Sequence, residues 1–504
     1  MASASTTPMR PISHEWSSLP VELRLQIFGY VAGEQRSRTT ELVPFTFRRL
    51  LIDNSQLDRF SKATEGKKAM RLSYIRYLCL RIKLQDYDYP ECDRPESHAT
   101  INWNKQRFTN SLIELFRVLR RWNPSSNRDT GLIFEITAYS PGDNRRSEGA
   151  SMEYALHENF QLAEDLASSP SMAGFMYDKD ARDRLATGMI WHSPTTVQGL
   201  ERLHGTPPVL TTKKDLKEVP IVHTLWIRHQ LRRGINGSSL ARILRMALTK
   251  VTSFRLETAP DPHPQLRYFS DWNSLISKLP HHIRHFSLNI FPRHFFPPLF
   301  MNATFGLPTS LTEKALAERA HHLMSLCPPA GTNSLNLIQH LRKSQQLEHG
   351  SRLAQLCLEV PYDPRGGASL FQGQINHLLK EAAVTARHLP ELKILEIWCH
   401  ERMKAFVFRY EHEKDQVTIT WRTSEDWINL AEGSIQQWQG VAQKYIVVFS
   451  VKELPVLRNP PSPSWVISYG DGHIDRKVVY SQLKLRDLAI HPVTLARADI
   501  IRIL

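Results

Sequence analysis

The sequence predicts an α/β fold in which an irregular solenoid of helix–strand units is followed by a C-terminal α+β segment. A six-residue pattern, apolar-x-x-apolar-x-apolar, recurs through residues 46–400 and is typical of short buried strands. Several copies begin about 30 residues apart and follow an amphipathic helix, as the stacked units of a repeat protein do. After residue 400, two segments alternate between apolar and polar residues, which indicates a β-hairpin.

The composition is that of a globular chain long enough for two or three domains. Of the 504 residues, 41% are hydrophobic, and 64 Lys and Arg against 50 Asp and Glu give a net charge of +14. The five cysteines form no Cys-x-x-Cys pair, so we expect neither a disulfide framework nor a zinc site, and we infer a reducing compartment. Residues 1–13 lack the apolar segment of a signal peptide, and no run of about 18 apolar residues follows, so we expect no membrane span and a cytoplasmic and/or nuclear location.

The first ordered element is expected within residues 14–45, after a disordered tail at residues 1–13. Ser17 or Ser18 can cap a helix whose first turn contains Pro20. Such a helix packs either on its own domain or on a partner. Its apolar stripe consists of residues that recur at every fourth position: Leu19, Leu23, Ile27 and Val31.

The string Leu-Pro-x-Glu-Leu-x-x-x-Ile-Phe-x-x-Val at residues 19–31 resembles the opening of an F-box, a helical module that binds the Skp-type adaptor of a cullin–RING ubiquitin ligase. The resemblance implies a helix-in-groove contact made by apolar anchors. An F-box continues with a third helix, whereas this chain has the short polar stretch Ala32–Pro44. The residues that the resemblance places at the adaptor contact are Leu19, Pro20, Leu23, Ile27 and Phe28.

The repeat body is expected over residues 46–400, with insertions near 123–212 and 291–345. Amphipathic helices precede the strand pattern at residues 240–248, 275–279 and 375–386, and another is expected at Phe108–Trp122. Helix, turn and strand at this spacing predict a leucine-rich-repeat-like solenoid, with an ordinary α/β domain as the alternative. The strand pattern, which has a weaker copy at Gly131–Pro141, occurs at Phe47/Leu50/Ile52, Ile75/Leu78/Leu80, Val222/Leu225/Ile227, Val251/Phe254/Leu256, Ile283/Phe286/Leu288, Leu353/Leu356/Leu358, Leu392/Leu395/Ile397 and Leu485/Leu488/Ile490.

Residues 401–504 are expected to form a C-terminal β-hairpin plus helix segment. Ala405–Glu411 and Val417–Arg422 alternate around a charged turn, and a helix at Ser434–Tyr445, a Pro-rich loop at Pro455–Pro463, and a closing strand and helix follow. The residues expected to face each other across the hairpin are Phe406, Phe408 and Tyr410 on one strand and Val417, Ile419 and Trp421 on the other.

Five segments extend the resemblance over most of the chain. Together they are similar to F-box proteins of filamentous fungi, which pair an N-terminal F-box with a divergent repeat body and a C-terminal domain of unassigned function. The segments are Thr46–Asp53, Ser73–Cys92, Gly131–Pro141, Leu389–Trp398 and the hairpin that ends at Thr418–Arg422.

The chain carries no recognisable catalytic motif. Phosphate-binding, dinucleotide-binding, zinc-protease and serine-hydrolase signatures are all absent from the sequence. Gly470–His473 is typical of a turn, and Cys399–His400 ends an apolar strand without an activating partner. We therefore expect no enzyme activity, no cofactor and no metal ion.

The repeated strands define a candidate substrate-binding surface. Successive side chains of a strand alternate between faces, so the residues between the inward apolar positions share the outer face of the sheet. Tryptophans among charged residues are typical of binding hot spots. The residues expected there are Tyr77, Arg81, Trp226, Arg228, Arg255, Glu257, His285, Asn289, Glu359, Glu396 and Trp398.

The resemblance to F-box proteins implies an F-box-type substrate-recognition subunit of an SCF-type cullin–RING ubiquitin ligase. Its expected partners are the Skp-type adaptor with its cullin ligase and an unidentified protein substrate held by the repeat body. The alternative is a non-catalytic repeat scaffold for protein–protein interaction that has lost adaptor binding. Basic pairs such as Arg120–Arg121 and Lys213–Lys214 are scattered among acidic residues, which argues against a nucleic acid partner.

Overall fold

The structure is a computed structural model of the 504-residue chain. The N-terminal tail and the F-box-like residues 14–45 lie outside the described residues, as does most of the predicted insertion at 123–212. The structure describes residues 48–490 except 89–90, 92–93, 123–130, 143–201, 203–204, 213–215, 228–233, 259–271, 291–309, 330, 346–349, 361–366, 402–403, 426–427 and 459–475.

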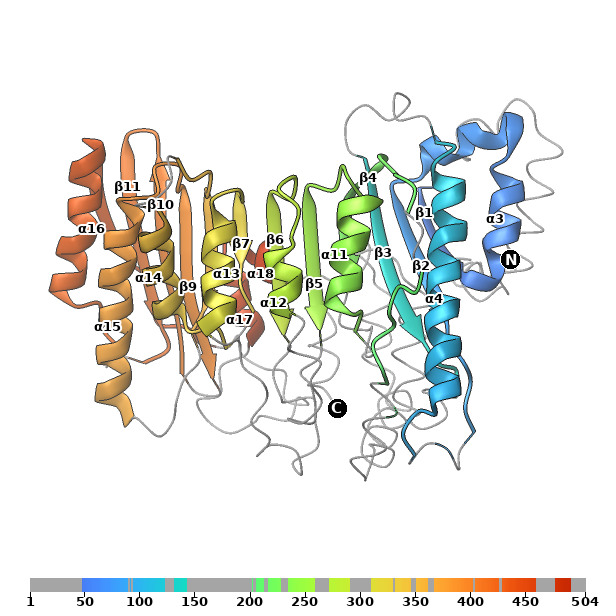
Figure 1. The fold of residues 1–504 in the computed structure, drawn as a ribbon. Helices are drawn as coiled ribbons and strands as arrows, with labels where there is room; N and C mark the ends of the chain where they lie inside the picture. Colours follow the sequence, from blue (N-terminus) through green and yellow to red (C-terminus); the bar gives the residue numbers. More distant parts are fainter. Residues whose placement is uncertain are drawn as a thin grey trace, which may run out of the picture.

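The fold is mixed α/β and is built on one twelve-stranded sheet whose strands lie side by side in chain order (Figure 1). All neighbouring strands are parallel except around β10, which is antiparallel to both β9 and β11. The strands are β1 (Arg49–Asp53), β2 (Tyr77–Lys83), β3 (Leu132–Tyr139), β4 (Val222–Ile227), β5 (Ser253–Thr258), β6 (His285–Ile290), β7 (Ser325–Cys327), β8 (Gln355–Glu359), β9 (Ile394–Glu401), β10 (Lys404–Glu413), β11 (Gln416–Thr423) and β12 (Val448–Glu453).

One face of the sheet is covered by helices that also follow chain order, each packing beside the next from α11 to α16 (Figure 1). The short helices α17 (Arg476–Gln482) and α18 (Arg486–Ala489) lie behind the sheet in this view, on its other face. The first strands are linked by the 3₁₀ helices η1 (Asn54–Gln56) and η2 (Gly66–Tyr74). The covering helices are α3 (Leu57–Ala63), α4 (His98–Leu119), α11 (Gly237–Met246), α12 (Trp272–Ser277), α13 (Ser310–Ala320), α14 (Ser334–Gln345), α15 (Gly367–Ala386) and α16 (Glu432–Tyr445).

Polar residues fix several helix ends. The Ser97 side chain accepts a hydrogen bond from the backbone amide of Thr100 at the start of α4, and Asn236 does the same for Ser239 at the start of α11. At the other end of α16, Ile446 adopts a left-handed conformation with φ of 56° and is almost fully exposed. The left-handed conformation of a non-glycine residue costs roughly 1 kcal/mol of free energy, so the sharp turn from α16 into β12 slightly destabilises the folded chain.

A single hydrophobic core lies between the sheet and the helices, and it extends from Ile52 in β1 to Ala442 in α16. The recurring apolar residues of the strands point into it because alternate side chains share a face. The rings of Phe254 in β5 and Phe286 in β6, for example, lie 5.7 Å apart between centroids. The six-residue pattern is confirmed as strand at every predicted place except one.

The exception is Leu485/Leu488/Ile490, where the strand prediction is wrong because residues 486–489 form helix α18. The structure also differs at residues 291–345, which the sequence marked as an insertion. From Ser310 onward this segment forms α13, β7 and α14, which are regular parts of the two layers. Strand β12, between α16 and the Pro-rich loop, was not expected.

The hairpin β10–β11 has the predicted pairing, with Phe408 opposite Trp421 and Tyr410 opposite Ile419. It does not form a separate C-terminal unit, however, because β10 pairs with β9 along eight residue positions, from Lys404↔Glu401 to Glu411↔Ile394. Trp438 of α16 packs on the rings of Phe408 and Tyr410, at 5.2 and 4.9 Å between centroids. The boundary predicted at residue 401 therefore lies inside the sheet and its main core.

The helices pack against the sheet, and their length and hydrophobicity bear on whether any of them could lie in a membrane. Among the residues that the structure describes, no helix combines the length and the apolar character needed to cross a membrane.

We expect Trp438→Ala to destabilise the protein by about 3–5 kcal/mol, because a fully buried indole leaves a cavity between α16 and the hairpin. Chemical denaturation followed by circular dichroism measures this change. Trp103→Ala on α4, where the side chain is 43% exposed, is the matched control and should change the free energy of unfolding by less than about 1 kcal/mol. Equal effects of the two substitutions would contradict the core described above.

Candidate protein-binding face of the sheet

The face of the sheet opposite the main helical layer carries polar and charged side chains in aligned rows. Strand pairing places Glu135, Trp226, Arg255 and Ser287 beside one another on β3, β4, β5 and β6. The same face continues through Glu396 on β9, which lies opposite Arg409 on β10. We call this surface the polar face.

The residues predicted to bind substrate lie on the polar face, but many of them are not exposed. Tyr77, Trp226, Arg255, His285 and Glu359 are partly exposed. Arg228 lies outside the described residues. The expectation of an open surface is wrong for the buried members, because other side chains and the C-terminal segment cover them: Arg81, Glu257, Asn289, Glu396 and Trp398.

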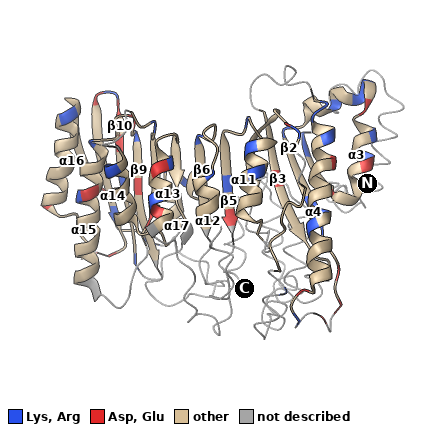
Figure 2. Ribbon diagram, in the orientation of Figure 1, with Lys and Arg blue, Asp and Glu red and all other residues tan. Residues whose placement is uncertain are grey.

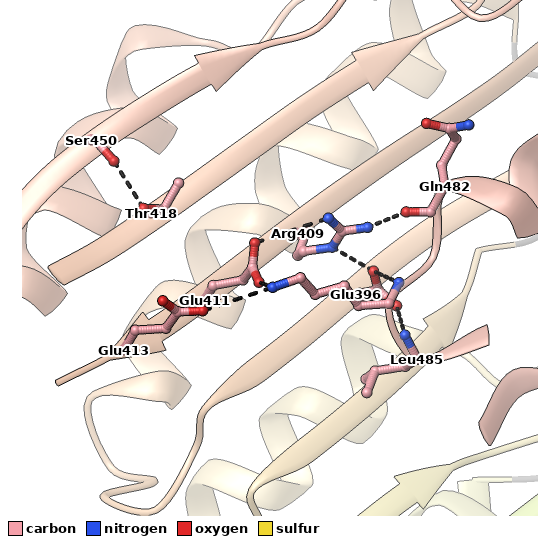
Figure 3. Close-up of polar contacts among 9 residues, drawn as sticks. Glu396, Arg409, Glu411, Glu413, Thr418, Ser450, Gln482 and Leu485 are labelled. Atoms are coloured by element: carbon pink, nitrogen blue, oxygen red, sulfur yellow. Dashed lines mark hydrogen bonds and ion pairs between the residues drawn. The ribbon is translucent and has the colours of Figure 1, made fainter. Parts of the chain in front are cut away.

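The C-terminal segment, residues 476–490, covers the polar face over β6 to β10. Figure 3 shows Glu396 at the centre of the contact, with its side chain completely buried. Its carboxylate accepts hydrogen bonds from Arg409 Nε at 2.6 Å and from the backbone amides of Lys484 and Leu485 at 2.9 and 2.8 Å. These donors replace the water that a buried carboxylate loses.

The same segment is held at other points through its backbone. Arg409 donates a hydrogen bond to the carbonyl of Gln482. Further along, Ser287 Oγ donates to the carbonyl of Leu488 at 2.7 Å, and Asn289 Nδ2 donates to the carbonyl of Ala489 at 2.6 Å. The polar face thus binds the main chain of a segment about 200 residues away from Ser287 and Asn289.

A second, smaller hydrophobic core lies under the C-terminal segment and includes Trp398, Tyr480 and Leu485. The rings of Trp398 and Tyr480 lie 5.1 Å apart. A hydrogen bond with Cys327, together with burial, raises the pKa of the Cys357 thiol in this core. Cys357 is therefore a neutral, packed thiol at pH 7 and is not activated as a nucleophile.

The other half of the polar face is organised by charge pairs and aromatic contacts. The Tyr77 hydroxyl donates to the carboxylate of Glu135, and its ring lies 6.0 Å from that of Trp226. Arg81 Nε pairs with Asp53 at 3.0 Å, and its guanidinium stacks on Tyr139. These partners explain how Arg81 and Glu135 are buried without leaving an uncompensated charge.

Arg255 lies between Trp226 and Ser287 on the polar face. Burial lowers the pKa of Arg255, while its electrostatic interactions with Glu257, Cys327 and Asp487 of α18 oppose that shift.

Sequence reasoning missed Arg409, Ser287 and residues 482–489 as parts of this site. Arg409 is a charged member of an alternating hairpin strand, and Ser287 lies between two apolar strand positions, so both could have been assigned to the outer face. Nothing in the local sequence of Gln482–Ala489 indicates which strands it covers. The predicted adaptor-contact residues Leu19, Pro20, Leu23, Ile27 and Phe28 lie outside the described residues.

The described part of the chain contains no group of three or more His, Cys, Asp or Glu side chains arranged to hold a metal ion. Instead, side chains of the polar face form hydrogen bonds and ion pairs with one another and hydrogen bonds with the main chain of the C-terminal segment. Such an arrangement is suited to holding polypeptide.

Residues 265–474 match a sequence family described as a family of unknown function (DUF6546). The matched region begins just before α12, includes β6 to β12 and ends just before α17. No curated protein matches the chain.

We expect Glu396→Gln to loosen the C-terminal segment, because the amide removes the negative charge and turns a donor toward backbone amides that are themselves donors. Trypsin should then cleave after Lys484 and Arg486 at least fivefold faster than in the wild-type protein, as followed by mass spectrometry. Glu413→Gln is the control, since Glu413 is 80% exposed and lies 3.8 Å from Lys484 Nζ. Unchanged cleavage in Glu396→Gln would mean that this carboxylate does not hold the segment.

Proposed function

We propose that the protein is an F-box-type substrate receptor of a cullin–RING ubiquitin ligase. Residues 19–31 would bind the Skp-type adaptor, and the sheet-and-helix body would hold a protein for ubiquitylation. The receptor itself would catalyse no reaction. It raises the local concentration of substrate lysines near the charged conjugating enzyme.

The observation that carries this proposal is the N-terminal string with Leu19, Pro20, Leu23, Ile27 and Phe28 in F-box spacing. Its apolar stripe has the period of a helix that packs into a groove. If one of these apolar residues were replaced by Asp, the carboxylate would be buried in the contact without a compensating charge or hydrogen bond, and binding would be lost.

We further propose that the body is leucine-rich-repeat-like. The order of its elements supports this interpretation, because β4 to β9 are parallel, follow one another in chain order and are separated by single covering helices. Repeat proteins of this kind offer extended surfaces to other proteins. The C-terminal hairpin, α16 and β12 would then close one end of the repeat array.

A second candidate is a repeat scaffold that binds proteins without a ligase. The polar stretch Ala32–Pro44, which stands where an F-box has its third helix, favours this alternative. The two candidates differ only in adaptor binding.

The proposal is tested by co-precipitation of the full-length protein with the Skp-type adaptor. We expect Leu23→Asp and Ile27→Asp each to reduce adaptor recovery at least tenfold, because each places a charge in an apolar contact. Leu311→Asp is the matched control, since Leu311 is 66% exposed on α13, and it should leave recovery unchanged. Equal recovery of wild type and both N-terminal variants, or no recovery at all, would refute the proposal and favour the scaffold.

A further inference from the structure

A row of exposed cations lies along the edge of the molecule where the parallel strands begin. In Figure 2 this is the upper edge of the sheet and of the helical layer, where blue segments recur. The side chains come from the ends of α11, α12 and α14, or just after them, and from the residues before β6, β8 and β9. We call it the basic rim, and its members are Lys250, Lys278, Arg284, Lys343, Arg352 and Lys393, all exposed.

The fold gathers these residues although they are spread over more than 140 positions of the sequence. Parallel strands all begin at one edge, and backbone hydrogen bonds hold the starts in line: Arg284 N donates to Thr252 O at 2.7 Å, and Lys393 N donates to Ala354 O at 2.9 Å. With strands about 4.8 Å apart, the rim from β5 to β9 is about 19 Å long. The scattered basic residues of the sequence thus become one surface.

The charges of the basic rim are not neutralised within the described part of the protein. None of its six side chains forms an ion pair there, whereas the neighbouring Arg342 pairs with Glu381 at 2.9 Å. Among the described residues of these connections, Glu391 is the acidic one, and Glu413 at the end of β10 and Asp415 in the β10–β11 turn mark one end of the rim. Burial lowers the pKa of His388, and the positive charges of Lys444, Arg342 and Arg387 lower it further, as expected where cations gather.

Helix dipoles account for only part of this arrangement. A cation in the last helical turn is favoured by about 0.3–1 kcal/mol, an effect that fades beyond that turn. Arg284, Arg352 and Lys393 lie after the helix ends, at the starts of strands, and gain little from it. Exposed like charges side by side repel one another, so the rim has an electrostatic cost that an anionic partner would remove.

We propose that the basic rim binds an acidic segment of a partner protein. An extended peptide of about six residues spans 19 Å at about 3.3 Å per residue, so its Asp or Glu side chains can follow the rim. Nucleic acid fits less well, because the rim consists of short turns: among the described residues it has no projecting helix to enter a groove, and its exposed aromatic rings are those of histidines such as His281 and His322, with no exposed Trp, Tyr or Phe on which bases could stack. The inference goes beyond the proposed ligase role and does not depend on residues 19–31.

The test is binding of fluorescent peptides to the full-length protein, measured by anisotropy. The probes are an eight-residue peptide of alternating Asp and Glu, its Asn/Gln counterpart and an eight-nucleotide single-stranded DNA. The rim variant carries Arg284→Glu, Arg352→Glu and Lys393→Glu. The control variant carries Lys62→Glu, Lys67→Glu and Lys68→Glu, which change the net charge equally at exposed positions in α3 and η2, at the far end of the sheet.

We expect the acidic peptide to bind the wild-type protein, the neutral peptide to bind at least tenfold more weakly, and added salt to weaken the acidic complex. The rim variant should lose at least tenfold in affinity, and the control variant less than twofold. Equal losses in both variants would show attraction by net charge alone and overturn the proposal. So would absence of peptide binding, or tighter binding of the DNA that the rim variant abolishes. Circular dichroism of both variants verifies that each is folded.

Discussion

Backbone hydrogen bonding between successive strands is the constraint on which the rest of this structure depends. Each strand from β2 to β11 has a neighbour on both sides, and some strands are very short, β7 having only Ser325–Cys327. A strand of three residues has too few bonds to stand alone, so it is held by β6 and β8 and by the core beneath it. The continuous sheet in turn creates two long faces, and each face must either be covered by other elements or remain exposed to solvent.

The two faces are shielded by different means. The helical layer buries apolar side chains, and this burial requires only complementary volume and hydrophobicity. The polar face instead buries charged groups such as Glu396 and Arg409, which are stable away from water only if their hydrogen bonds are satisfied. The main chain of residues 482–489 satisfies them, so the C-terminal segment is held largely through atoms that every residue possesses. Its position is then fixed by the few side chains that enter the small core, such as Tyr480 and Leu485.

The sequence predicted the strands well because a buried strand that is packed on one face needs apolar residues at fixed spacing. Strand β7 escaped the pattern because Leu323 and Leu326 fit it but the third position is Pro328. Strand β12 was overlooked although Ile446, Phe449 and Val451 fit the pattern, and as an edge strand it buries little. The motif ending at Ile490 was misassigned since the same apolar spacing also suits a single helical turn. The alternation of faces placed the site residues correctly on one side of the sheet. The cover over Glu396 could not be predicted, because contacts about 90 residues apart in sequence have no local signature.

The helices that cover both faces of the sheet also limit where the body can bind another protein. Over β6 to β10 one face lies under α12 to α16 and the other under α17 and α18. A partner of this half must displace the C-terminal segment, contact the outer sides of the helices or bind along an edge where the strands begin or end. Displacement would expose the buried carboxylate of Glu396 and break its bonds to Lys484 and Leu485, which costs several kcal/mol before any new contact forms. Binding at the basic rim exposes nothing and relieves repulsion among cations that already face solvent. On energetic grounds the strand-start edge is therefore favoured over displacement of the C-terminal segment as a recognition surface of this half of the protein.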